Sequence, residues 1–372
     1  ASIPPFSIIR RRTQEVFNVQ PCLWQMKVVE AILHRERDVL CIAGTGMGKT
    51  LTFWMPLLFR PEGIQIVVTP LNLLGKQNIV ALTRAHIPAI SINSETATAT
   101  NFHAILKLKY RAIVISPEQM MRPDGEFEKI LKDTRFASHI ISIVIDEAHC
   151  LTDWGEFRPE YRELARLHYL LPSIPLLVAS ATLTKTALND IMRLLQMRLG
   201  NTAVLRRSSD RPNIKIGVKK IKYALNTFAD LAFLVPDDYK DGDPPLPKFL
   251  VFFDNISDSI AAANSLRKRL PTPLREKIKW FNSDMSNTFK EAEFDNLTTG
   301  KTWGLCTTTS FGMGMDIPDI ALVIQWRATC NLSALWQRFG RAARSRELTG
   351  TALLFAEHEY FDEERAAKAE RS

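Results

Sequence analysis

Residues 39–50 read VLCIAGTGMGKT, so four apolar residues run into a glycine-rich turn that ends at Gly48, Lys49 and Thr50. The apolar run is typical of a buried strand, and a helical pattern follows over residues 49–59. Small residues let backbone N–H groups surround a phosphate, and a helix N-terminus adds partial positive charge. This strand–loop–helix order predicts a phosphate-binding loop, although a glycine-rich turn can also be a simple tight turn.

Each residue of this loop has an expected role. Lys49 would reach the β- and γ-phosphates of a nucleotide, and the Thr50 hydroxyl would ligate Mg²⁺. Ala43 stands where the common pattern has its first glycine. The remaining contacts would come from the loop residues Gly44, Thr45, Gly46, Met47 and Gly48.

A second apolar run, residues 140–146, ends in a pair of carboxylates, Asp146 and Glu147. Asp146 would hold Mg²⁺, while Glu147 would orient and deprotonate the attacking water. Two adjacent carboxylates at a strand end would repel each other without a cation. Together with the loop they predict ATP and Mg²⁺ as cofactors and metal-assisted hydrolysis of the nucleotide.

A loop rich in aromatic residues follows, with residues 151–161 reading LTDWGEFRPEY. Trp154 and Phe157 can stack on unpaired bases, and Arg158 can stack or bind a phosphate. Trp154 and Tyr161 could instead be ordinary core aromatics. The loop therefore suggests a nucleic acid that controls hydrolysis.

Length and composition are consistent with this interpretation. A chain of 372 residues suits two domains, and its 46% hydrophobic and 24% charged content is typical of globular proteins. The net charge of +8 favours a polyanionic partner. Five scattered cysteines without a CxxC pair argue against a disulfide framework and against zinc. No apolar run is long enough to span a membrane, and no signal peptide opens the sequence.

Short apolar runs alternate with helical patterns in both halves, which predicts an α/β protein with mostly parallel sheets and helices on both faces. The first half has expected strands at 39–42, 64–69, 112–116, 140–146 and 176–180, with helices at 49–59, 71–84 and 185–195. After the polar stretch 206–212, strands are expected at 214–218, 249–253, 278–281, 303–307, 321–325 and 351–355, with helices at 226–234, 257–269 and 333–343. We therefore expect domains at 1–207 and 214–372, joined by a linker at 208–213.

The motifs together resemble the superfamily 2 helicases and, within them, the RecQ-like DNA helicases. The matching residues, in order, are Gln25, the phosphate loop, Thr69 and Pro70 with Gln77, Ser116 and Pro117, Asp146 to His149, Ser180 and Thr182, residues 311–316, and residues 337–344. Residues 148–161 and the run FGMGMDIPD at 311–319 are the distinctive ones. The resemblance implies two tandem RecA-like domains.

The resemblance also implies roles around the nucleotide. Gln25 would recognise adenine, and Asp316 would contact the ribose or couple the domains. His149, Ser180 and Thr182 would relay the nucleotide state, although His149 could also be a satisfied core residue. The second domain would complete the site with Arg341 and Arg344 as arginine fingers and with Gln337 beside them. Three positions apart on a helix, the two arginines can face one cleft; a solvated basic helix face is the alternative.

For nucleic acid, the resemblance implies single-stranded DNA and single–double-strand junctions as partners, with 3′-to-5′ movement. Thr69, Pro70, Ser116 and Pro117 would contact phosphates at one sheet edge, and the loop with Trp154, Phe157 and Arg158 would couple DNA to hydrolysis. A monomer is expected, located in the nucleus by analogy if the source is eukaryotic and otherwise in the cytoplasm.

Three departures from the family pattern stand out. No arginine precedes Gln25 within residues 17–24, so adenine stacking would be weaker. Arg338 stands where the family often has glutamate, which is reminiscent of RNA helicases. No cysteine-rich zinc module or winged helix follows, so we expect the two motor domains only; the resemblance implies motor activity and duplex unwinding, but the motor domains alone do not imply that unwinding is efficient. An RNA helicase and a non-catalytic nucleic-acid scaffold remain the alternatives.

Overall fold

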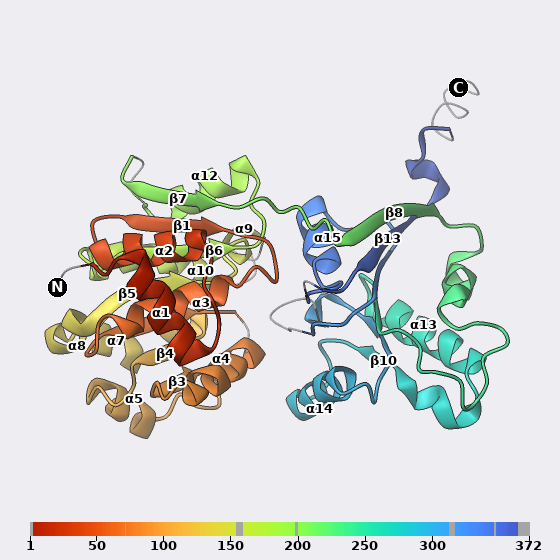
Figure 1. Cartoon of the computed structure of the whole chain (residues 1–372), viewed down its shortest axis with the longest axis horizontal. Helices are drawn as coiled ribbons and strands as arrows, with labels where there is room; N and C mark the ends of the chain where they lie inside the picture. The colour runs from red at the N-terminus through yellow and green to blue at the C-terminus, as the bar shows by residue number, and fades with distance from the viewer. Residues whose placement is uncertain are drawn as a thin grey trace. The chain divides into compact units, whose positions relative to one another are not determined.

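The computed structural model describes residues 3–70, 72–153, 159–197, 200–311, 317–345 and 347–363, without the side chains of 72–74, 76, 77, 152, 153, 159 and 310. The chain divides into two compact units, Ala1–Ser209 and Asp210–Ser372 (Figure 1). The division falls inside residues 208–213, the stretch expected to link two domains. No described helix is both long and apolar enough to cross a membrane.

The first unit is built on a parallel sheet with the strand order β3-β4-β2-β5-β6-β1-β7. The strands are β1 (Asp38–Ile42), β2 (Ile64–Val68), β3 (Ala89–Ile92), β4 (Ala112–Ile115), β5 (Ile140–Ile145), β6 (Leu176–Ser180) and β7 (Thr202–Arg206). The five inner strands are buried along their whole length, because helices cover both faces of such a sheet. The edge strands β3 and β7 are the ones that the sequence pattern missed, since they are shorter or half-exposed.

Helices and 3₁₀ turns connect these strands. They are α1 (Phe6–Phe17), α2 (Leu23–His34), α3 (Lys49–Trp54), η1 (Met55–Leu58), α4 (Asn72–Arg84), α5 (Ala99–Leu106), α6 (Pro117–Met120), α7 (Glu126–Lys132), α8 (Thr134–His139), α9 (Cys150–Asp153), α10 (Pro159–Glu163), η2 (Leu164–Arg166), α11 (Leu167–Leu170) and α12 (Lys185–Leu194). The helix expected at 49–59 is divided into α3 and η1, because Pro56 lacks the N–H that an α-helix needs. In Figure 1, α1 and α2 lie in front of the sheet.

The second unit repeats the plan with the parallel order β10-β11-β9-β12-β13-β8. Its strands are β8 (Ile214–Lys220), β9 (Phe249–Phe252), β10 (Ile278–Phe281), β11 (Gly304–Thr307), β12 (Leu322–Trp326) and β13 (Gly350–Ala356). Its helices are α13 (Ile256–Arg269), α14 (Asn287–Thr298) and α15 (Leu332–Phe339), with 3₁₀ turns η3 (Leu225–Thr227), η4 (Ala229–Leu234), η5 (Thr272–Lys277), η6 (Thr309–Phe311) and η7 (His358–Tyr360). The expected α/β architecture of two mostly parallel sheets is confirmed.

Two helix predictions in this unit were wrong. Residues 226–234 form η3 and η4 rather than one α-helix, because Phe228 has φ 52° and its ring packs edge-on against Phe253 at 6.0 Å. The helix expected at 333–343 ends at Phe339, with Gly340 as its C-cap and Ala343 at φ 41°. The second error matters for function, since Arg341 and Arg344 lie beyond the helix.

Candidate nucleotide site and arginine segment

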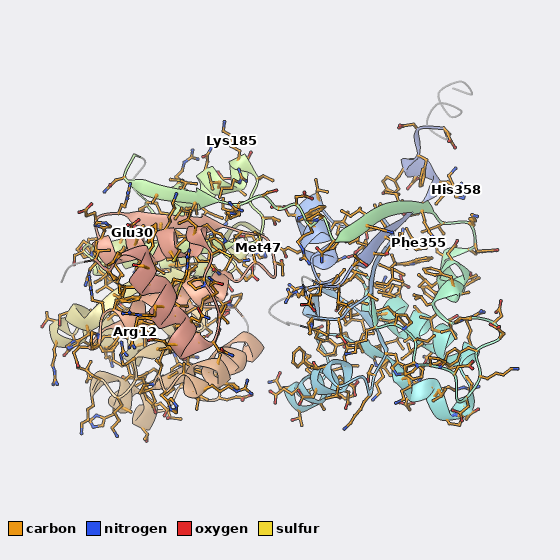
Figure 2. The ribbon with its side chains drawn as sticks, in the orientation of Figure 1. Arg12, Glu30, Met47, Lys185, Phe355 and His358 are labelled. Atoms are coloured by element: carbon orange, nitrogen blue, oxygen red, sulfur yellow. The ribbon has the colours of Figure 1, made fainter. Side chains whose placement is uncertain are left out.

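The phosphate loop connects β1 to α3 and has the conformation that its glycines allow. Gly46 and Gly48 both have φ near 80°, a region that side chains rarely adopt. A Cβ on Gly48 would also lie 2.8 Å from Nε2 of Gln25. Met47, labelled in Figure 2, marks this turn. The structure thus explains why glycine, and not merely a small residue, stands at these two positions.

Gln25 is held against the loop from α2. Its Nε2 donates to the Gly48 carbonyl at 2.8 Å, and its Oε1 accepts the Cys22 N–H at 2.7 Å. The side chain is only 4% exposed. Each end of the amide makes one of these bonds, which fixes the side chain against the loop and leaves a second N–H and a second lone pair for adenine.

Lys49 begins α3 and folds back over the loop. Its Nζ donates to the Ala43 carbonyl at 2.8 Å, while the Ala43 N–H donates to Ser180 O at 3.1 Å. Thr50 is exposed in the first turn of the helix. The ammonium thus occupies the concave side of the loop, where a phosphate oxygen could replace the carbonyl as its partner.

The acidic pair follows β5 directly. Asp146 is 8% exposed and its N–H donates to Val68 O at 2.9 Å, whereas the Glu147 N–H donates to Oδ1 of Asp146 at 2.9 Å. Glu147 has φ 51°, so the chain turns sharply between the two carboxylates. Burial, and then the charge of Glu147, raise the pKa of Asp146 to about 7, against the opposing effect of Lys49. A hard cation such as Mg²⁺ fits this site, because it would supply the positive charge that the buried carboxylates need.

A contact chain joins the acidic pair to the end of β6. Nδ1 of His149 lies 3.5 Å from Oε2 of Glu147 and 3.4 Å from the Ser180 hydroxyl, which in turn donates to Thr182 O at 3.2 Å. Nε2 of His149 lies 3.5 Å from the Cys150 thiol. His149 is buried, as a core residue would be, yet its position beside Glu147 is the one that a relay requires.

The residues expected at the nucleic-acid edge are neighbours, because β2 and β4 pair with Val68 opposite Ile115. Their hydroxyls differ in this conformation: that of Thr69 is buried with no hydrogen-bond partner among the described residues, whereas that of Ser116 accepts a cap bond and keeps its O–H to donate. Thr69 is 3% exposed, and the Ser116 hydroxyl accepts the Gln119 N–H at 3.4 Å as the N-cap of α6. Pro117 is buried and Pro70 is half-buried, so side-chain contacts there would need a rearrangement.

Several predicted site residues lie in parts of the chain that the structure does not describe. Trp154, Phe157, Arg158 and Asp316 lie outside the described residues, as does the side chain of Gln77. Their roles stay predictions. Tyr161, next to them in sequence, is 2% exposed, which confirms the interpretation of this residue as a core aromatic.

In the second unit the arginine segment, defined here as residues 340–344, leaves α15 as a turn. The Arg341 N–H donates to Arg338 O at 3.0 Å, and the Arg341 side chain is 4% exposed. Nε of Arg344 donates to Gly340 O at 3.5 Å. Gln337 is half-buried on the last turn of α15. The expectation of a shared helical face for Arg341 and Arg344 was therefore wrong, because their backbones lie in a turn.

Arg338 has a structural position that its sequence did not reveal. Its Nη1 pairs with Oδ1 of Asp254 at 3.1 Å and donates to Oε1 of Gln325, and its guanidinium lies 5.4 Å from the centre of the Phe252 ring. The side chain is 5% exposed. The Arg338 side chain is thus buried and makes its contacts within the second unit. The presence of arginine at this position is therefore weak support for an RNA helicase.

The geometry agrees with what comparison with known proteins finds. The sequence matches the DEAD/DEAH box helicase family over residues 23–191 and the helicase conserved C-terminal domain over residues 245–346. The chain belongs to the DEAD/DEAH box helicases of superfamily 2. Within them it resembles the RecQ-like members, as expected from its motifs.

Two curated relatives illustrate the similarity. A protein of Acanthamoeba polyphaga mimivirus named as an ATP-dependent RNA helicase is 28% identical, over 87% of this chain and 56% of its own length. ATP-dependent DNA helicase Q-like 2 of Arabidopsis thaliana is 27% identical, over 86% of this chain and 44% of its own length. The chain thus spans about half of each of these relatives.

Solved structures support the fold. The helicase Lhr of Mycobacterium smegmatis, determined with single-stranded DNA and AMP-PNP, superposes with a TM-score of 0.69 at 18% identity. The match covers 95% of this chain and 48% of the Lhr chain. Both units are accordingly RecA-like helicase domains in tandem, as the sequence predicted.

Proposed function

We propose that this helicase is an ATP- and Mg²⁺-dependent DNA motor of the RecQ-like type, which moves 3′ to 5′ on single-stranded DNA and opens single–double-strand junctions. The observation that carries the proposal is the acidic pair, with the buried Asp146 beside the ammonium of Lys49 and with Glu147 touching His149. These groups would supply the metal ligand, the phosphate-binding cation and the base that nucleotide hydrolysis needs from the first unit, whereas a non-catalytic scaffold would have no use for them.

In the proposed mechanism, Lys49 exchanges the Ala43 carbonyl for phosphate oxygens, and Thr50 and Asp146 hold the metal. Mg²⁺, when bound, supplies charge neutralisation at the β- and γ-phosphates. Glu147 orients the water and takes its proton. His149 contacts both Glu147 and Ser180, and Ser180 bonds to Thr182. A change in the protonation of Glu147 would therefore alter the hydrogen bonds of Ser180 and Thr182.

The second unit contributes positive charge in this proposal. Arg341 and Arg344 would stabilise the charge that develops on the γ-phosphate, with Gln337 beside them. Trp154, Phe157 and Arg158 would stack on and bind single-stranded DNA and so stimulate hydrolysis. We further propose that the motor acts as a monomer and, in a eukaryotic source, in the nucleus.

An RNA helicase is the second candidate, because one relative of similar identity is named as such. The deciding experiment measures Mg²⁺-dependent ATP hydrolysis with no nucleic acid, single-stranded DNA, duplex DNA and single-stranded RNA of equal length. Strong stimulation by single-stranded DNA alone, abolished in Glu147→Gln, is the expected result. The Trp154→Ala variant should lose the stimulation while still binding DNA.

Other outcomes decide against parts of the proposal. Equal or greater stimulation by RNA would replace the DNA assignment with the RNA one. A Trp154→Ala variant that behaves like the wild type would remove the aromatic loop from the mechanism. No hydrolysis under any condition would leave only the scaffold.

A further inference from the structure

The arginine segment is held by a residue from the start of the second unit. Nη2 of Arg211 donates to the carbonyls of Ala343 at 2.8 Å and Ala342 at 3.2 Å, and its Nη1 donates to Gly340 O at 3.5 Å. One guanidinium therefore binds three carbonyls of a five-residue segment. It does so from a position about 130 residues earlier in the chain, one residue after the unit boundary.

A second residue of the same stretch completes the contact. Nδ2 of Asn213 donates to Ala343 O at 2.8 Å and to Leu348 O at 2.9 Å, and Oδ1 of Asn213 accepts Nε of Arg211 at 3.3 Å. The Asn213 carbonyl accepts the Gly350 N–H at 2.9 Å. Arg211 and Asn213 thus act as one clamp, with their own relative position fixed by a hydrogen bond.

The start of β13 also packs closely against the segment. A Cβ on Gly350 would lie 3.0 Å from Cβ of Ala343 and 3.1 Å from Cβ of Ala342. The Ala343 N–H donates to Ile320 O at 2.8 Å. The segment is therefore held by close packing against Gly350, by the bond to Ile320 O and by the clamp.

The segment needs such support because its own conformation is unfavourable. Carbonyls at the C-terminal end of a helix lack intrahelical partners. Ala343 adopts φ 41°, a left-handed conformation that is unfavourable for an alanine. Without external donors, α15 would gain by extending past Phe339, and the side chains of Arg341 and Arg344 would then point in other directions.

We propose that Arg211, assisted by Asn213, is a positioning residue that sets the direction of Arg341 and Arg344, and that it makes their placement depend on the chain segment joining the two units. The inference rests on the proposed function, since it assigns Arg341 and Arg344 to the transition state. Burial and the charge of Arg344 lower the pKa of Arg211, which is consistent with two guanidinium groups lying close together. The two side chains meet at one carbonyl, because Nη1 of Arg211 and Nε of Arg344 both donate to Gly340 O at 3.5 Å.

The test compares Arg211→Met with Arg269→Met. Arg269 is a suitable control because it also lies in the second unit and donates from Nε and Nη2 to one backbone carbonyl, Val235 O, at 3.2 Å, far along the chain from the arginine segment. Both variants lose an arginine that binds backbone carbonyls. The readouts are kcat and KM for ATP with saturating single-stranded nucleic acid, and the thermal unfolding temperature.

We expect Arg211→Met to lower kcat at least about ten-fold with KM for ATP changed by less than about two-fold, because an interaction made in the transition state is lost. Arg269→Met should lower the unfolding temperature similarly and leave kcat within about two-fold of the wild type. Arg211→Lys keeps the charge with fewer donors, so its kcat should lie between those of the wild type and Arg211→Met. If Arg211→Met does not fold, Arg211→Lys replaces it in the comparison with Arg269→Met.

A double-variant cycle separates positioning from a general loss of structure. If Arg211 acts through Arg341 and Arg344, adding Arg211→Met to the combined Arg341→Ala and Arg344→Ala variant should lower kcat by less than about two-fold further. Full multiplication of the two effects, or a kcat for Arg211→Met within about two-fold of the wild type, would overturn the inference while leaving the proposed function intact. A wild type that hydrolyses no ATP would overturn both.

Discussion

The phosphate loop of the first unit and the arginine segment of the second both present cations suited to phosphate, yet they are built in different ways. The loop consists of consecutive residues between β1 and α3, and Lys49 bonds within it to Ala43, six positions away. The arginine segment depends on Arg211, which is 132 positions from Ala343. One site is local, whereas the other is assembled by the fold.

The two sites also differ in how their backbones reach unusual conformations. In the loop, left-handed φ values fall on Gly46 and Gly48, which adopt them at little cost. In the arginine segment the left-handed residue is Ala343, and long-range hydrogen bonds compensate for it. A local site therefore tolerates changes elsewhere, while an assembled site should respond to substitutions far from it in sequence.

The largest expected effect contrasts one cation from each site. Arg341→Ala should lower kcat about 10³-fold or more with nucleotide affinity nearly unchanged, as the proposed role of Arg341 as an arginine finger requires. Lys49→Ala should instead weaken nucleotide binding as well as hydrolysis, because Lys49 lies in the loop that holds the phosphates. Stopped-flow binding of a fluorescent ATP analogue and steady-state hydrolysis measure the two effects separately. Equal losses of nucleotide affinity in both variants would mean that Lys49 and Arg341 do not differ in role, one in nucleotide binding and the other in the transition state.

The next effect tests the acidic pair. Glu147→Gln keeps the size of the side chain and removes the base, so kcat should fall about 10²- to 10³-fold. ATP binding should persist, because Asp146 and Lys49 are unchanged. Single-turnover hydrolysis with preformed ATP complex measures this directly. A variant with more than a tenth of wild-type activity would mean that another group takes the proton.

The same contrast explains what the sequence could predict. The phosphate loop, the acidic pair and the five inner strands of the first sheet follow from local patterns, namely apolar runs that end in glycine or in carboxylates. The sequence predicted that Thr69 and Ser116 share one sheet edge, because parallel strands bring their carboxyl ends together; the two residues directly follow the paired residues Val68 and Ile115.

What the sequence missed depends on tertiary contacts. The pattern of residues 333–343 is helical. The bonds from Arg211 and Asn213 to the carbonyls of Gly340, Ala342 and Ala343, together with the bond from the Ala343 N–H to Ile320 O, favour the end of the helix at Phe339. Residues 206–212 predicted a polar linker, and no spacing rule indicated that its last arginine would bind a segment far along the chain. The ion pair of Arg338 with Asp254 was hidden for the same reason.

A smaller effect concerns pH and follows from the burial of Asp146. Its pKa in the folded, metal-free protein is about 7, above the value near 4 expected when unfolded. The folded state therefore binds more protons, and Asp146 lowers stability as pH rises from about 4 to about 7. Asp146→Asn should be more stable than the wild type at pH 8 in EDTA, by a few kcal/mol at most, with a small difference at pH 4.5.

Thermal unfolding at both pH values checks this expectation. Mg²⁺ with a nonhydrolysable ATP analogue should reverse the order at pH 8, because a ligand that binds only the folded wild type raises its stability. An Asn variant that is less stable than the wild type at pH 8 without metal would mean that Lys49 already compensates the buried charge.

The smallest effect concerns Arg338, which lies in α15 directly before the arginine segment. Arg338→Met removes its ion pair with Asp254 and its bond to Gln325, but Asp254 is about one-third exposed and can be solvated. We therefore expect a loss of about 1–3 kcal/mol in the stability of the second unit. Hydrogen exchange of peptides spanning β12 and α15 measures it locally. Lys279→Met is the control, because Lys279 pairs with Glu293 at 2.7 Å elsewhere in the unit and should loosen β10 and α14 instead.

The same variant tests the RNA alternative. A buried Arg338 predicts that stimulation by DNA and by RNA changes in parallel in Arg338→Met, with faster exchange in α15. A selective loss of RNA stimulation at unchanged exchange would show that Arg338 reaches nucleic acid and that its pairing with Asp254 opens during the cycle. Pairing Arg338→Glu with Asp254→Lys sharpens the test, because the reversed pair should restore part of the protection if the charge pair anchors α15.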